Sequence, residues 1–242
     1  MAGPIASSRP SAAGGYVTTA KEYDGTNDYA TRGADLTGIA DGKAGTISFW
    51  MDINNNGNQM DIMDTPNRRF YIRRHSDDKV TIRGQTSGGT NLLIMSSNLV
   101  HQWPEGWVHV MIAWDLATPE AYMYIGDVSD EAAGATKSDG TIDYTRGDWS
   151  VGASTGGGFD YNGCLSEIWF DDFFIDPSVT ANRRKFIDAA GKPVNLGADG
   201  STPTGASPLI YMPGGDPADN KGTGGNFTIT GNLAACANAP GD

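Results

Sequence analysis

The chain has 242 residues, enough for one large domain or two small ones, and 29 acidic against 17 basic residues give it a net charge of −12. This acidic balance argues against binding to a nucleic-acid backbone, which needs clustered Lys and Arg, and no stretch reaches the ~20 apolar residues of a membrane helix. With 33 Gly, 12 Pro and 38% hydrophobic residues, the composition predicts many turns around one core.

Residues 1–16 are predicted to form a flexible N-terminal arm. They are small, almost uncharged and rich in Ser, Ala, Gly and Pro, so they bury too little apolar area to offset their ordering entropy. Because the segment lacks the apolar core of a secretory signal, we expect the protein to be made in the cytoplasm.

About a dozen short strands are predicted after the arm, because large apolar residues alternate with small or polar ones between Gly, Asn and Asp. Three blocks show the pattern best: YDGTNDYA (23–30), GTISFWMDI (45–53) and GWVHVMIAWD (106–115). The expected strands are 17–23, 29–32, 46–53, 60–64, 69–74, 79–83, 91–96, 107–115, 120–125, 149–153, 163–174 and 227–230. So many short strands indicate an all-β sandwich of two antiparallel sheets, its core filled by aromatic residues.

A single helix is predicted over 178–190, where Asp176, Pro177 and Ser178 supply a start signal and Gly191 and Pro193 a stop. Residues 17–190 then form the sandwich, and 191–242 a Pro/Gly-rich extension with one returning strand at 227–230, beside the N-terminal strand. We expect 232–242 to be flexible on its own and to become ordered only against neighbouring subunits.

Together with NGCLSEIWFDDFFID (162–176), the three blocks resemble the laminin-G-like, or concanavalin A-like, jelly roll over about 17–188. The resemblance implies a two-sheet antiparallel jelly-roll sandwich with one short C-terminal helix and irregular tails. It also implies a bridge from Cys164 to Cys236, although synthesis in a reducing compartment favours two free thiols equally. The segment 192–212 resembles the end of such domains in virion proteins of tailed phages.

Catalysis is not expected. Laminarinase-type hydrolases of this fold alternate Glu, Asp and Glu along one strand, and the nearest run, Glu167 to Asp172, has Trp169 at the central position. Glu167 and Asp171 would lie ~13 Å apart on a regular strand, too far for the carboxyl pair of a glycosidase. His109 alternates with Trp107 and Met111, which is typical of a hydrogen-bonded sheet histidine.

Calcium is the one cofactor that the resemblance suggests, through Asp24, Asn27 and Asp28 in one turn. The alternative is that these side chains only stabilise the turn by bonding its backbone. Asp216, Asp219 and Asn220 form a similar loop with a weaker claim.

Carbohydrate binding would use exposed aromatic side chains beside Asn, Asp and Gln. Trp103, Trp149, Phe159 and Tyr161 are the predicted sugar-binding residues, with Trp103 in a loop before Pro104 the most exposed; core packing is the alternative for each. The basic cluster Arg68, Arg69, Arg73 and Arg74 is either a solvated strand edge or a contact for an anion or subunit.

The favoured function is a non-enzymatic structural protein of a tailed-phage virion: a head decoration, head fibre or tail-associated protein. It would contact other virion proteins or copies of itself and display a lectin-like domain to a host glycan, without nucleic-acid binding or membrane insertion. The alternatives are a bacterial surface or secreted carbohydrate-binding module and, third, a glycoside hydrolase.

Overall fold

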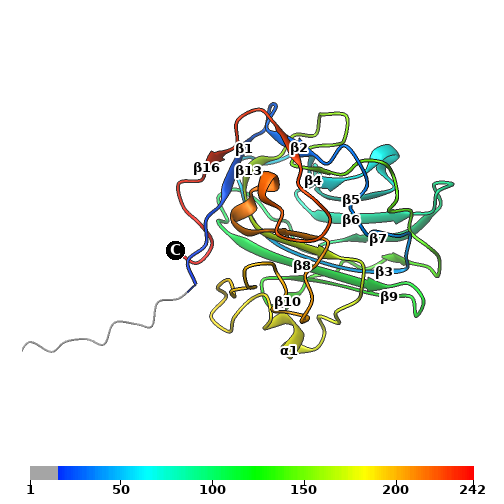
Figure 1. Cartoon of the computed structure of the whole chain (residues 1–242). Helices are drawn as coiled ribbons and strands as arrows, with labels where there is room; N and C mark the ends of the chain where they lie inside the picture. Colours follow the sequence, from blue (N-terminus) through cyan, green and yellow to red (C-terminus); the bar gives the residue numbers. More distant parts are fainter. Residues whose placement is uncertain (1–15) are drawn as a thin grey trace, which may run out of the picture.

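The computed structural model describes residues 16–242, so the predicted arm up to residue 15 lies outside the described residues. Two antiparallel sheets of eight strands stack on each other (Figure 1). This confirms the predicted all-β jelly-roll sandwich. Within residues 16–242, no helix has the length and apolar character needed to span a bilayer.

The first sheet has the order β10-β9-β8-β3-β13-β1-β16, and β14 also pairs with β13. Its strands are β1 (Lys21–Asp24), β3 (Ala44–Ile53), β8 (Val108–Asp115), β9 (Glu120–Ile125), β10 (Val128–Ser129), β13 (Asn162–Asp171), β14 (Ile210–Met212) and β16 (Ala234–Ala235).

The second sheet has the order β11-β7-β6-β5-β4-β12-β2-β15. Its strands are β2 (Tyr29–Thr31), β4 (Met60–Asp64), β5 (Phe70–Arg74), β6 (Val80–Gln85), β7 (Asn91–Ser96), β11 (Thr136–Lys137), β12 (Ser150–Val151) and β15 (Thr228–Thr230). The helical turns are η1 (Pro66–Arg68), α1 (Thr180–Arg183), η2 (Pro213–Gly215) and η3 (Pro217–Asp219).

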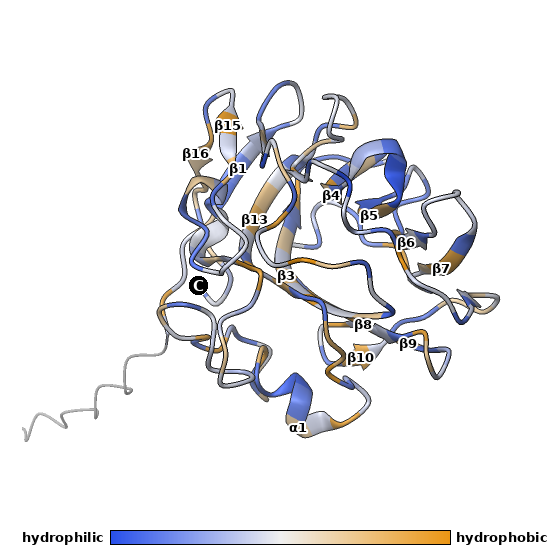
Figure 2. Cartoon of the chain, turned by 45° about the vertical axis from the view of Figure 1, so that its right-hand side comes forward, coloured by the Kyte–Doolittle hydropathy of each residue, from blue (hydrophilic) through white to orange (hydrophobic). Residues whose placement is uncertain are grey.

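Aromatic rings fill the space between the sheets, as the sequence predicts. Phe70 of β5 lies at the centre, with ring-centroid distances of 5.3 to 5.8 Å to four fully buried aromatic residues: Trp114, Tyr144, Trp149 and Phe170. Figure 2 shows hydrophobic residues along β13 and a hydrophilic η1 turn between β4 and β5. Alternation along each strand therefore turns the apolar side chains inward.

The outer face of the first sheet is covered by the chain itself. Met111 of β8 and Trp169 of β13 point away from the main core and pack in a second apolar cluster with Phe186, Leu196 and Tyr211. The segment that carries α1 lies below β8 in Figure 1. This part of the face is therefore buried under the chain's own residues.

The predicted helix over 178–190 is wrong in length, because only Thr180–Arg183 is α-helical. Phe186 and Ile187 lie beyond the end of this helix and are both buried. In addition, Asp188 Oδ1 accepts the backbone N–H groups of Ala190 and Lys192, and so forms a turn where the helix was expected.

The C-terminal extension adds three strands instead of the one predicted. β14 and β16 join the first sheet, and β15 pairs with β2 in the second. A bulge in β13 between Ser166 and Trp169 separates the half of β13 that pairs with β1 from the half that pairs with β14. The extension is therefore part of both sheets.

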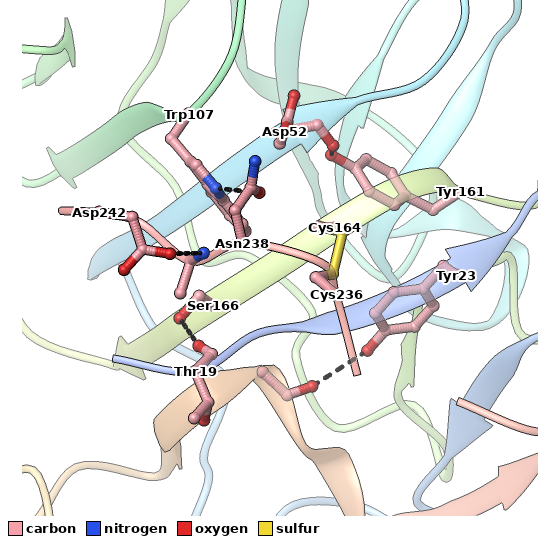
Figure 3. Close-up of a disulfide and its surroundings, with 12 residues drawn as sticks. Thr19, Tyr23, Asp52, Trp107, Tyr161, Cys164, Ser166, Cys236, Asn238 and Asp242 are labelled. Atoms are coloured by element: carbon pink, nitrogen blue, oxygen red, sulfur yellow. Dashed lines mark hydrogen bonds between the residues drawn. A yellow bond between two sulfur atoms is a disulfide. The ribbon is translucent and has the colours of Figure 1, made fainter. Parts of the chain in front are cut away.

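The last eleven residues are held by their own domain, which corrects the expectation that neighbouring subunits order them. Cys236 forms a disulfide with Cys164 of β13 (Figure 3). Thr18 Oγ1 donates to Pro240 O at 2.7 Å, and Trp107 Nε1 donates to Asn238 Oδ1 at 3.0 Å. Of the two alternatives for the cysteines, the structure therefore has the bridge.

Candidate functional site

Two loops meet around Trp103 at one end of the sandwich. Residues 54–59 connect β3 to β4, residues 97–107 connect β7 to β8, and we call the pair the Trp103 rim. Trp103 N donates to Asn56 Oδ1 at 2.8 Å, and Asn56 Nδ2 donates to Trp103 O at 3.1 Å. The Trp103 residue is 55% exposed, which is unusual for so large an apolar ring.

Arg74 braces both loops from below, although it is fully buried. Its Nε donates to His101 O at 3.1 Å and its Nη1 to Asn58 O at 3.2 Å, and it forms an ion pair with Asp78. Asp78 in turn accepts the backbone N–H of Gly57 at 2.7 Å and the side-chain amide of Gln102. A buried charge persists where it is paired and hydrogen-bonded, so this network holds the rim in one conformation.

His101 fixes the second loop from its other side. Its Nε2 lies 2.9 Å from Asp130 Oδ2 and its Nδ1 3.1 Å from Glu105 Oε2, so both ring nitrogens face carboxylates. The side-chain oxygen of Asn55 is buried at the rim without a hydrogen-bond partner in the described structure. The rim thus offers an exposed aromatic ring beside several amides on preorganised loops.

A second cluster lies on the outer face of the second sheet. The guanidinium carbon of Arg73 lies 4.0 Å from the centre of the Tyr71 ring, and that of Arg83 lies 4.6 Å from the same ring. The guanidinium carbon of Arg68 lies 4.5 Å from the centre of the Phe159 ring. These five residues, with Arg69, Asp61 and Asp64, are called the arginine–aromatic cluster.

Strand register assembles this cluster. Tyr71 of β5 stands opposite Arg83 of β6 and Asp64 of β4, and Arg73 stands opposite Asp61. A register shift in β4 between Asp61 and Met63 keeps both acidic residues out of the apolar core. The turn at η1 then returns Arg68 over Asp61, to which its Nη2 donates at 2.5 Å.

Burial dominates the electrostatics of the two carboxylates. It raises the pKa of Asp61 to about 7 although the Arg68 charge opposes the shift, and it raises the pKa of Asp64 to about 7 with a further contribution from Asp61. Asp64 Oδ2 accepts the backbone N–H of Thr155 at 3.2 Å, whereas its Oδ1 has no partner within residues 16–242.

Asp64→Asn is expected to stabilise the protein at about pH 8 by about 1–2 kcal/mol and to have little effect at about pH 4. The unfolded carboxyl releases its proton near pH ~4, whereas the native one holds it up to about pH 7. Stability therefore falls as the pH rises through this window, and an uncharged amide avoids the loss. Thermal melts of wild type and Asp64→Asn at both pH values measure this difference in stability, and Asp139→Asn, at an exposed position, is the control. An equal change in melting temperature at both pH values would contradict the prediction.

The four predicted sugar-binding aromatics are not brought together. Trp149 and Tyr161 are fully buried in the core, so they present no surface to a sugar and their prediction is corrected. Tyr161 is used internally, because its hydroxyl donates to Asp52 O at 3.1 Å. Phe159 is 46% exposed and Trp103 55%, and they belong to the two separate sites described above.

In the YDGTNDYA turn, the side chains make the backbone hydrogen bonds that are expected if they stabilise the turn. Asp24 Oδ1 accepts the backbone N–H groups of Thr26, Asn27 and Asp28 at 2.8 to 3.2 Å, which also lowers the pKa of Asp24. Asp28 Oδ1 is bonded to the N–H of Asn232 at 2.7 Å. Within residues 16–242, no three or more His, Cys, Asp or Glu residues are grouped to hold a metal ion, and calcium stays a prediction.

The weaker candidate loop does not converge on one point. Asp216 pairs with Lys21 at 3.1 Å and Asp219 with Lys221 at 2.6 Å. Asn220 is buried, and its Oδ1 accepts the backbone N–H groups of Tyr211 and Gly222. Its role is to hold the extension in place.

The run from Glu167 to Asp172 lies under the extension and not in a cleft. Glu167 adopts a φ of 50° at the β13 bulge, and its carboxylate accepts bonds from Tyr16 Oη, Tyr211 Oη and Gly214 N, each at 3.1 Å. Burial raises its pKa. This carboxylate joins the start of the described chain to the extension.

His109 is the hydrogen-bonded sheet histidine that the pattern predicts. Its Nε2 lies 2.8 Å from Ser48 Oγ, and burial lowers its pKa to about 3. The imidazole is therefore neutral at physiological pH.

Sequence reasoning missed Asp61, Asp64 and Arg83, and the bracing role of Arg74. Alternation in TIRGQ places Arg83 on the face opposite Ile82 and Gly84, so strand periodicity alone could have predicted that Arg83 lies on the outer face. The two Asp residues in MDIMD are three positions apart, which a regular strand would put on opposite faces, and only the bulge unites them.

Comparison with known proteins agrees with this architecture. The model of the concanavalin A-like lectin/glucanases superfamily matches residues 24–172. A search of curated proteins found no match.

Among solved structures, the chain is similar to a candidate carbohydrate-binding protein from Bacteroides ovatus, with a TM-score of 0.63 and 15% identity over 93% of this chain and 61% of that one. It thus spans about three fifths of that protein. A heptameric SAP-like pentraxin from Limulus polyphemus has a TM-score of 0.50 and 17% identity over 66% of this chain and 78% of that one.

A sialidase from Streptococcus pneumoniae has a TM-score of 0.50 and 11% identity over 67% of this chain and 27% of that one. At such identities the likeness shows the fold alone. The family match covers more than half of the chain, and the chain therefore belongs to the concanavalin A-like lectin/glucanases superfamily.

Proposed function

We propose that this chain is a non-enzymatic, lectin-like protein that binds a cell-surface glycan at the Trp103 rim, as a structural component of a tailed-phage virion. The observation that carries the glycan part is the exposed indole of Trp103, bonded to Asn56 on a loop that the buried Arg74 holds rigid.

The proposed recognition uses the two chemistries of a sugar. The indole face packs on the apolar C–H face of a pyranose, and the amides of the 54–59 loop and Gln102 bond its hydroxyls. Because Arg74 and Asp78 already order both loops, little conformational entropy is lost on binding. Multiple copies in an assembly would strengthen a weak single-site affinity through avidity.

The virion part of the proposal rests on the resemblance of 192–212 to the ends of such domains in phage proteins. Its expected partners are other virion proteins and copies of itself. Mass spectrometry of purified particles tests this part: peptides of the chain should be recovered at a fixed ratio to the major capsid protein.

A second candidate is a secreted or surface carbohydrate-binding module of a bacterium. The Cys164–Cys236 disulfide favours it, because such bridges persist in oxidising compartments. Recovery of the protein from culture medium or the cell surface, and not from particles, would support this candidate. The glycan site is the same under both.

Trp103→Ala is expected to weaken binding of a neutral glycan, identified on an array, at least about tenfold, because the stacking surface is lost. Trp103→Tyr should keep most of the affinity, and Val179→Ala, an exposed apolar residue on the N-terminal side of α1, should keep all of it. Isothermal calorimetry measures the affinity. Equal binding by wild type and Trp103→Ala would remove the rim from the proposal.

The absence of catalysis in this proposal is tested with the same glycans. Incubation of the protein with each array-positive glycan should release no reducing sugar. Hydrolysis that survives repurification would instead support the glycoside hydrolase alternative.

A further inference from the structure

Unpartnered polar atoms concentrate in the arginine–aromatic cluster. Within residues 16–242, seven of the eleven buried side-chain N and O atoms without a hydrogen-bond partner belong to six of its residues: Asp61, Asp64, Arg68, Arg69, Arg73 and Arg83. Five of the seven are guanidinium nitrogens, which only donate. Folded proteins satisfy nearly all buried polar groups, so this concentration indicates a group that the chain alone does not supply.

The internal acceptors leave these donors unsatisfied. Arg73 Nη2 lies 3.0 Å from Asp61 Oδ1, close enough for an ion pair but without hydrogen-bond alignment. Arg83 Nη2 donates to the backbone O of Arg68 at 2.9 Å, and its Nε has no partner in the described structure. A ligand oxygen bearing negative charge is the acceptor that matches several convergent guanidinium groups.

Charge and access agree with such a ligand. With the neighbours of Arg69 included, five arginines (Arg68, Arg69, Arg73, Arg83 and Arg146) outnumber four acidic residues (Asp61, Asp64, Asp143 and Asp160), even when all four are ionised, in a chain of net charge −12. The cluster reaches the surface through Arg68, Arg69, Arg83 and Phe159, which are partly exposed.

Phe159 covers Arg68 from a loop that is rich in glycine. Gly157, Gly158 and Phe159 have φ angles of 75°, 94° and 55°. A side chain at Gly157 would meet only the hydroxyl end of Tyr29, and one at Gly158 would meet no neighbouring atom. An aromatic ring on this loop forms the outer wall of the cluster and offers a sugar ring a stacking surface.

We propose that the arginine–aromatic cluster is a second binding site, separate from the Trp103 rim, that takes the oxyanion of an acidic saccharide. The carboxylate of a uronic acid accepts hydrogen bonds from Arg68 and Arg83, and the sugar ring packs on Phe159. This site depends on neither the virion role nor neutral-glycan binding at the rim.

Protonation of the acidic members tunes this site. The titratable and charged groups that face Asp61 and Asp64 are Arg68, Arg73, Arg83, Tyr71 and Asp160, and burial raises the pKa of both carboxyls to about 7. Below that pH they become neutral, the cluster gains net positive charge, and its affinity for an anion rises.

The test is calorimetric titration with D-glucuronate, with glucose as the neutral analogue and inorganic sulfate to separate saccharide recognition from binding of any oxyanion. Wild type should bind glucuronate several-fold more tightly at about pH 6 than at about pH 8, and glucose should not compete. Arg83→Gln should weaken glucuronate binding at least about tenfold, as expected for a charged hydrogen bond. Arg184→Gln is the matched control: this arginine follows α1 and pairs with Asp127, and the variant should bind as wild type.

Two further variants distinguish loss of this binding site from misfolding of a variant. Asp64→Asn should bind glucuronate more tightly than wild type at about pH 8 and reduce the pH dependence to the part that Asp61 contributes, a gain that a misfolded protein does not show. Trp103→Ala should bind glucuronate as wild type does, which separates this site from the rim. Binding of sulfate equal to glucuronate reduces the site to a general oxyanion site and overturns the saccharide assignment. No glucuronate binding, or equal binding by wild type and Arg83→Gln, overturns the site itself.

Discussion

Phe70→Ala is expected to lower the free energy of unfolding by about 4 kcal/mol, the largest effect of any single side chain considered. Phe70 is fully buried, and its ring contacts Trp114 and Phe170 from the first sheet and Trp149 beside its own sheet. Its removal leaves a cavity that three large rigid rings are poorly able to fill. The loss therefore combines transfer free energy with unrelieved cavity free energy.

Urea denaturation followed by far-UV circular dichroism and tryptophan fluorescence measures this effect. Phe70→Leu, which keeps most of the volume, should lose only about 1–2 kcal/mol. The exposed Val179→Ala should lose less than about 0.5 kcal/mol. A loss below about 1 kcal/mol for Phe70→Ala would show that the sheets close over the gap.

The double variant Cys164→Ala and Cys236→Ala is expected to lose about 4 kcal/mol of stability in the chain-entropy model. The bridge joins residues 72 positions apart, so it removes much of the freedom of the unfolded chain. In the native state it also fastens the tail across β13, as Figure 3 shows. Loss of the bridge should therefore free residues 232–242 first, while both sheets persist.

Two measurements separate the global and the local consequences. Denaturation of wild type with and without reductant should reproduce the difference between wild type and the double variant, which itself should not respond to reductant. Hydrogen exchange should rise in 232–242 and around β1 before it rises in β3 and β8. Equal stability of oxidised and reduced protein would contradict the prediction.

The fold was predictable because strand alternation is a local property of the sequence. Each half-buried strand records its inner face in every second residue, as Phe70, Ile72 and their neighbours do in β5. The short edge strands β10, β11 and β16 escaped prediction because two residues hold no pattern.

Burial of the aromatic residues was harder to predict than their presence. Trp149, in the RGDWS loop-like segment, and Tyr161, beside a Gly-rich run, have the sequence context of exposed residues, yet both are core. Trp103 has a similar context and is exposed. Which of them reaches the surface depends on the path of distant strands, such as β4 and β2, on either side of β12.

Composition and periodicity alone thus establish an acidic, aromatic-filled β sandwich, because these properties depend on residue type and spacing along one strand. The two candidate sites arise only in three dimensions. The register shift in β4 brings Asp61 and Asp64 to one face beside Arg73 and Arg83, and the buried Arg74 ties together two loops that lie some forty residues apart in the chain. Such juxtapositions depend on long-range pairing, which local alternation does not encode.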